Sequence, residues 1–91
     1  MRTEFVDVDA DLAQKWLALN KNYRPISVRS RDNYADDMIN GRWTQNHQGI
    51  AFDTSGKLVD GQHRLSAIVE ANKSRPGLSI RLLVARDVDP R

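Results

Sequence analysis

The sequence predicts a small single domain of the α+β class, in which a mixed β-sheet with a central hairpin packs against about three helices. Three observations lead to this prediction. Residues 4–8 alternate apolar and polar side chains, and residues 78–85 form the strongest apolar run, as strands do. Three other segments repeat apolar residues at helical spacing behind a residue that can cap a helix. The turn-forming residues 53–56 separate two short apolar runs and indicate the hairpin.

Length and composition fit one globular domain covering residues 1–91. The 91 residues are 40% hydrophobic and 29% charged, which is typical of a domain that folds alone. No apolar run approaches the ~20 residues of a membrane span. The segment Met1–Phe5 lacks the apolar core of a signal peptide. We therefore expect a cytoplasmic protein with no membrane partner. The absence of cysteine excludes disulfides, zinc–thiolate sites and thiol catalysis.

The first predicted elements are a strand and a helix. Residues 4–8 form the strand, and Asp9 can cap a helix over about residues 10–20. Trp16 lies on the apolar face of this helix, so we expect it in the core.

A second helix is predicted from Ser27, its N-cap, to about Asn40, with Gly41 placed where a left-handed C-terminal residue belongs. Its flanking arginines offer a basic edge that would contact a DNA backbone without reading sequence. These are Arg24, Arg29, Arg31 and Arg42. Three carboxylates on the same helix oppose such binding and would form surface ion pairs instead, namely Asp32, Asp36 and Asp37.

The second half of the chain reads as hairpin, helix and strand. The hairpin strands are residues 49–52 and 57–59, and the third helix covers about residues 62–72. Residues 78–85 form the last strand, and residues 86–91 are expected to be a frayed end.

The hairpin also predicts neighbours. A turn around residues 53–57 places residue 60 opposite about residue 50, and residues 62–63 opposite about residue 47. The polar residues expected beside the start of the third helix are therefore Asn46, His47 and Gln48.

The densest group of functional side chains lies in the segment Leu58–Ala67, which reads LVDGQHRLSA. It predicts a strand, a glycine turn and the start of a helix, where unpaired N–H groups attract phosphate. Asp60, Gln62, His63 and Arg64 add a carboxylate, an amide, an imidazole and a guanidinium at this point. The structural alternative keeps Asp60 as an N-cap and the basic side chains as solvated.

Two histidines and an aspartate at one place also permit acid–base chemistry. The candidate catalytic residues are Asp60, His63 and His47. Their spacing fits no recognised transition-metal ligand set. Asp60 is instead a candidate to hold Mg²⁺ beside phosphate oxygens.

The motif DGQHRLSA resembles the Gly-x-x-Arg turn of the ParB/sulfiredoxin superfamily, and most of all its DGQHR variant in phage and bacterial proteins. The resemblance extends over YADDMINGRW, residues 34–43, and GIAFDTSGKL, residues 49–58, so it covers about residues 23–85. It implies a ParB/sulfiredoxin-like fold and a phage-associated protein acting in DNA-related processes.

The branches of this superfamily differ in chemistry. Sulfiredoxin uses a cysteine before its His-Arg pair, where this chain has Gln62 and no cysteine at all, so that activity is excluded. ParB binds CTP at a Glu-Arg-Arg sequence, and a free serine kinase holds nucleotide phosphates with a His-His-Arg turn. The shared element is phosphate binding, which the resemblance transfers to Gly61, His63 and Arg64.

The leading hypothesis is therefore a domain that binds nucleotide or nucleic-acid phosphate at Asp60–Arg64. Backbone N–H groups from Gln62 onward and the Arg64 fork would hold the oxygens, with Gly61 shaping the turn. Asp60 would hold Mg²⁺ with a nucleoside triphosphate such as CTP or ATP. Any turnover would be phosphoryl transfer or hydrolysis.

Two alternatives stay open. A ParB-like metal-dependent nuclease needs convergent carboxylates, of which Asp60 is the clear candidate. A non-catalytic phage interaction or inhibitor protein, monomeric or dimeric, would bind a protein partner through aromatic side chains. The aromatic residues to consider are Trp16, Tyr23, Tyr34 and Trp43.

Overall fold

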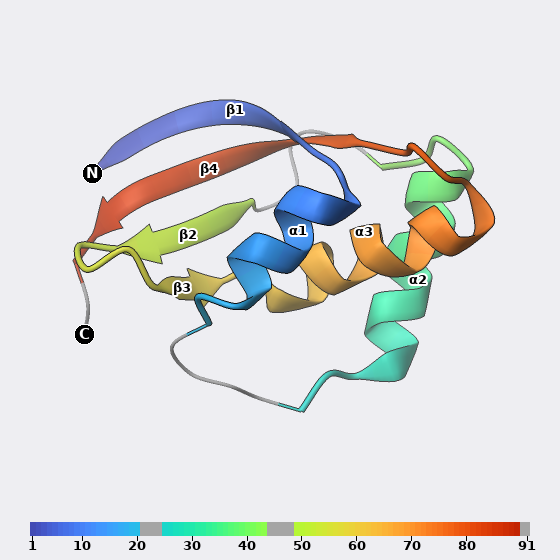
Figure 1. Cartoon of the computed structure of the whole chain (residues 1–91), viewed down its shortest axis with the longest axis horizontal. Helices are drawn as coiled ribbons and strands as arrows, with labels where there is room; N and C mark the ends of the chain where they lie inside the picture. The colour runs from blue at the N-terminus through green and yellow to red at the C-terminus, as the bar shows by residue number, and fades with distance from the viewer. Residues whose placement is uncertain (21–24, 44–48, 90–91) are drawn as a thin grey trace.

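The computed structural model describes residues 1–20, 25–43 and 49–89. The elements in chain order are β1 (Arg2–Val8), α1 (Ala10–Leu17), α2 (Val28–Ile39), β2 (Ile50–Asp53), β3 (Leu58–Asp60), α3 (Gln62–Ser74) and β4 (Ile80–Val88) (Figure 1). The predicted α+β class, with helices on a mixed sheet, is confirmed.

The four strands follow the order β1-β4-β2-β3 in one sheet. β4 is antiparallel to β1 and parallel to β2, while β2 and β3 form the antiparallel hairpin. The three helices cover one face of this sheet, and α3 packs between α1 and α2 (Figure 1). The hairpin therefore supplies an inner strand and an edge strand, and the chain leaves the edge strand directly into α3.

The core lies between the sheet and α3. Leu65 and Ile68 of α3 are fully buried, as are the small residues Ala67 and Ala71, which let the neighbouring elements approach closely. Trp16 is also buried and meets the Phe52 ring edge-on at 5.2 Å between centroids, which confirms its predicted place in the core. The remaining buried apolar residues are Val8, Ala13, Ala35, Met38, Ile50, Leu58, Leu78, Leu82 and Val84.

Helix ends follow the predicted capping residues. The Asp9 carboxylate accepts the Leu12 N–H at 2.9 Å and begins α1. The Ser27 hydroxyl accepts the Ser30 N–H at 3.3 Å and begins α2. Gly41 follows α2 with a φ of +71°, as expected of a glycine past a helix C-terminus.

The hairpin turn is built on a buried carboxylate. Asp53 is 2% exposed, and its Oδ1 accepts from the Ser55 N–H, the Ser55 hydroxyl and the Lys57 N–H. Three donors on one oxygen offset the cost of burying the charge and fix the turn that the sequence predicts.

The predicted hairpin register was wrong by one residue beyond the turn. Phe52 lies opposite Leu58, but an irregularity follows and Asp60 lies opposite Ala51 rather than Ile50. An extra residue on the β3 side explains the shift, because a bulge sets two residues against one.

The expectation of a frayed end over residues 86–91 was wrong for residues 86–88, since β4 continues to Val88. Arg86 lies opposite Arg2 of β1, and its Nε donates to the Glu4 carboxylate at 3.2 Å. Its guanidinium carbon is 5.0 Å from the centroid of the Phe52 ring and 5.7 Å from that of Trp16. These contacts order a segment whose local sequence carries no strong strand signal.

Candidate functional site

The turn between β3 and α3 depends on Gly61. Its φ of +109° lies in the region that glycine adopts without strain. A Cβ at this position would also collide with Ile50 Cδ1 and lie 3.2 Å from Ile50 Cα. Both the backbone conformation and the close approach to β2 therefore require glycine, and α3 can begin immediately after β3 ends.

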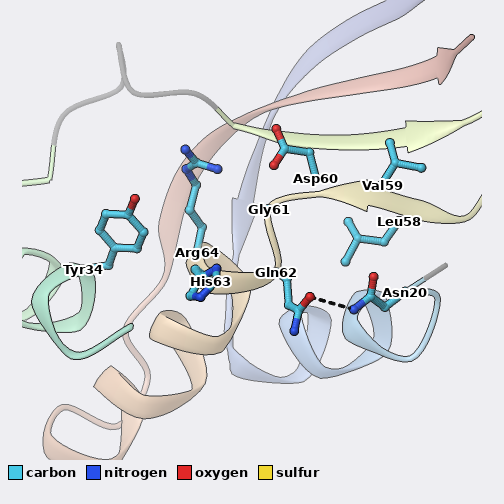
Figure 2. A pocket seen from close by; sticks show the side chains of 9 residues that line it. All are labelled: Asn20, Tyr34, Leu58, Val59, Asp60, Gly61, Gln62, His63 and Arg64. Carbon is cyan, nitrogen blue, oxygen red and sulfur yellow. Dashed lines mark hydrogen bonds between the residues drawn. The ribbon is translucent and has the colours of Figure 1, made fainter. Parts of the chain in front are cut away.

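A pocket of about 270 Å³ opens at this turn (Figure 2). Its walls come from β3, the first turn of α3, α2 and the chain just after α1. The lining residues are Asn20, Tyr34, Leu58, Val59, Asp60, Gly61, Gln62, His63 and Arg64. The four side chains predicted between residues 60 and 64 are thus brought together in one pocket.

The N-terminus of α3 carries no side-chain cap. Gly61 is the N-cap residue, and its carbonyl accepts the first helical bond, from the Leu65 N–H at 3.0 Å. The first turn contains no acidic residue. The partial positive charge of the helix end is therefore not compensated by a side-chain cap or by a carboxylate within the first turn, and the nearest carboxylate in sequence is that of Asp60. The structural alternative for Asp60 was wrong, because Asp60 does not cap the helix.

The Arg64 side chain is half-buried, and not all of its hydrogen-bond donors have partners among the described residues. Its Nη1 donates to the Gly49 carbonyl at 3.3 Å, whereas its Nε–H is buried and has no hydrogen-bond partner among the described residues. The guanidinium carbon is 5.9 Å from the centroid of the Tyr34 ring, which in turn meets the Trp43 ring edge-on. A buried donor without a hydrogen-bond partner costs about 1–3 kcal/mol.

Asp60 is exposed at the end of β3, and its carboxylate makes no hydrogen bond or ion pair within the described ranges. In the view of Figure 2 the Asp60 carboxylate and the Arg64 guanidinium extend to the same side of Gly61. The two charged groups form no salt bridge with each other. The pocket therefore offers both a cation and an anion to a ligand.

The Gln62 side chain is engaged within the protein. Its Oε1 accepts the Asn20 Nδ2–H at 3.0 Å (Figure 2). Asn20 also forms a parallel bridge with Leu58, whose N–H donates to the Leu19 carbonyl at 2.8 Å. Gln62 thus links the end of α1 to the start of α3.

His63 accepts a hydrogen bond that the sequence did not predict. The Ser27 N–H donates to His63 Nε2 at 2.9 Å. Because Nε2 is the acceptor, the neutral ring carries its proton on Nδ1. Nε2 is therefore occupied and is not free to act as a general base in this arrangement.

Part of the predicted neighbourhood is outside the described residues. This applies to Tyr23, Arg24, Asn46, His47 and Gln48, so the meeting of His47 with His63 stays a prediction. Sequence reasoning missed Asn20 and the role of Tyr34 as a pocket wall. Tyr34 belongs to the stretch that resembles the superfamily, which was a signal for it, whereas nothing in the sequence singled out Asn20.

Three other acidic residues, Asp36, Asp37 and Asp53, do not line the pocket. Asp36 and Asp37 pair with Arg42 at 2.6 and 3.2 Å, and Asp53 is engaged in the hairpin turn. No group of three His, Asp or Glu residues that could hold a metal occurs in the described parts of the chain. The geometry thus gives no convergent carboxylates for a two-metal nuclease.

Ion pairs also reduce the net positive charge of the arginine edge of α2. Arg31 pairs with the neighbouring Asp32 at 3.1 Å, and Arg42 with the two carboxylates of the last turn. Of the three arginines of this edge that lie in the described ranges, only the exposed Arg29 forms no such ion pair.

Comparison with protein-family models, with curated proteins and with solved structures finds no match to this chain. Within the three described ranges, no helix has the length and apolar character needed to cross a bilayer.

Proposed function

We propose that this chain is a ParB/sulfiredoxin-like domain that binds the phosphate of a nucleotide or nucleic acid at the turn Asp60–Arg64. The observation that carries the proposal is that the Arg64 guanidinium lines the pocket beside the uncapped start of α3. A guanidinium fork and helical N–H groups are the donors that phosphate oxygens prefer.

The pocket size indicates which part of a nucleotide it takes. At about 270 Å³ it lies below the ~300–1,000 Å³ of sites that enclose a drug-sized ligand. We therefore assign the pocket to phosphate groups and an adjoining part of the sugar, with the base outside. Selectivity between CTP and ATP would then come from elsewhere on the protein.

Asp60 gives the site a place for Mg²⁺. This ion binds through one or two carboxylates together with phosphate oxygens, and Asp60 is the one carboxylate among the lining residues. Mg²⁺ would neutralise charge on a bound triphosphate, which is the main requirement of phosphoryl transfer or hydrolysis. Asp60 is accordingly the stronger candidate for a catalytic role, since Nε2 of His63 is engaged by Ser27.

Calorimetry and thermal shift with CTP, ATP, GTP, UTP and their diphosphates, with and without Mg²⁺, test the proposal. A nucleotide at 100 times its Kd stabilises the fold by about 2.7 kcal/mol, or several degrees in Tm. We expect the shift to vanish in Arg64→Ala and its Mg²⁺ dependence to vanish in Asp60→Asn.

Arg29→Ala is the matched control, because it removes the same charge from an exposed position outside the pocket. It should keep the full shift. No shift with any nucleotide in the unaltered protein, or equal losses in the two arginine variants, would refute phosphate binding at this turn.

A further inference from the structure

The first two side chains of α3 each contact chain that precedes α2. Gln62 accepts from Asn20, and His63 accepts from the Ser27 N–H. The partners are 42 and 36 residues away in sequence, so these are tertiary contacts rather than features of the turn itself. The start of α3 therefore also holds two residues that precede α2 in the chain, Asn20 and Ser27.

Ser27 connects His63 to α2, because the residue that donates to His63 is also the N-cap of this helix. Its hydroxyl caps the helix at the Ser30 N–H, and its carbonyl accepts the Arg31 N–H at 2.9 Å. Tyr34 follows about two turns later on the same helix and presents its ring to the Arg64 guanidinium. A continuous chain of contacts thus runs from His63 through Ser27 and α2 to Tyr34. Tyr34 in turn contacts Arg64, the residue that follows His63 in the sequence.

We propose that His63 is a positioning residue of the phosphate site. Its Nε2 holds Ser27 and the start of α2, and α2 holds Tyr34 against Arg64, which keeps the guanidinium in place for a phosphate. The role in ligand binding rests on the proposed function, whereas the path from His63 to Arg64 can be measured without a ligand.

The competing role is direct contact, in which His63 Nδ1–H donates to the phosphate. Two amide substitutions distinguish a role of Nε2 from a role of Nδ1. The longer side chain of His63→Gln places an acceptor near the position of Nε2, and the shorter side chain of His63→Asn places its amide near that of Nδ1. Positioning predicts that glutamine substitutes for histidine, while direct contact predicts that asparagine does.

Hydrogen exchange by NMR on the ligand-free protein measures the path. We expect the Ser27 amide and the buried Arg64 Nε–H to exchange several-fold faster in His63→Asn and at nearly the original rates in His63→Gln. If the Arg64 Nε–H rate is the same in both variants, the path does not reach Arg64 and the proposal is overturned, whatever the ligand.

Calorimetry with inorganic pyrophosphate measures the consequence for binding. We expect Kd to stay within about twofold in His63→Gln and to rise about three- to tenfold in His63→Asn, the range of one net hydrogen bond. The opposite order would establish direct contact and overturn positioning. Absence of pyrophosphate binding in the unaltered protein refutes the proposed function, and the exchange rates then decide alone whether His63 fixes Arg64.

Discussion

Single residues of the motif divide into those with hydrogen-bond partners in the fold and those without such partners among the described residues. Gln62 and His63 have partners in the fold, whereas Asp60 and the Arg64 Nε–H have none among the described residues. The residue type alone did not show this division, because all four are polar side chains that suit either role. Gly61 has a different task, since it sets the path of the backbone between them.

Gly61→Ala should lower the free energy of unfolding by about 2–4 kcal/mol, from strain at positive φ and from overpacking against Ile50. Gly56→Ala is the control, because Gly56 has a φ of +82° but no atom within 4 Å of an added Cβ. It should cost only the conformational part, about 1–2 kcal/mol. Urea unfolding of both variants checks the difference, and equal losses would contradict the close packing at Gly61.

Among the elements, α2 depends on a tether at its first residues. Ser27 caps the helix through its hydroxyl and is held by His63 through its N–H, so one residue combines two separable contacts. Its φ of −74° is compatible with proline, which allows the N–H to be removed without changing the backbone angle.

Ser27→Ala should lose the cap, about 1 kcal/mol, and Ser27→Pro should lose the cap and about 0.5–1.5 kcal/mol more for the tether. In a His63→Ala background, where the acceptor is gone, the two substitutions should cost the same. Urea unfolding of the four variants forms a double-mutant cycle. A proline penalty that persists without His63 would show that backbone restriction, not the hydrogen bond, is responsible.

Element types were predictable from the sequence where the signal is local. Asp9, Ser27 and Gly41 mark helix ends by their own capping chemistry, and Asp53 begins a turn whose donors lie within four residues. The errors occurred where distant parts of the chain decide. Residues 86–88 are a strand because β1 and β2 lie beside them, and the bulge that shifts Asp60 depends on how the hairpin packs. The site was located by its motif, but the tethers of Gln62 and His63 depend on the tertiary fold.

In the whole molecule, Arg86 joins the two ends of the described chain. It connects β4 to Glu4 of β1 and covers the rings of Phe52 and Trp16, which belong to the sheet and to α1. Its side chain is 34% exposed, so most of its length contributes packing as well as charge.

Arg86→Ala should lower the free energy of unfolding by about 1–2 kcal/mol, through lost ring contacts and packing. Arg2→Ala is the matched control, because it breaks the ion pair with Asp87 on the same two strands with a side chain that is 74% exposed. It should cost less than about 0.5 kcal/mol. Thermal and urea unfolding compare the two, and a similar loss in both would mean that Arg86 acts only as a surface charge.

The place of β4 in the sheet has a consequence for the order in which the protein can fold. β4 is the last described strand to be synthesised, yet it lies between β1 and β2, and β1 has no other neighbour in the sheet (Figure 1). On the ribosome, β1 therefore stays unpaired until residues 80–86 emerge, because its partners lie 72–84 positions later in the chain. Such long-range pairing makes folding slow and late. We expect the turn Asp60–Arg64 to be synthesised well before the sheet that holds Ile50 against Gly61 can close, so the pocket forms only after β4 has emerged.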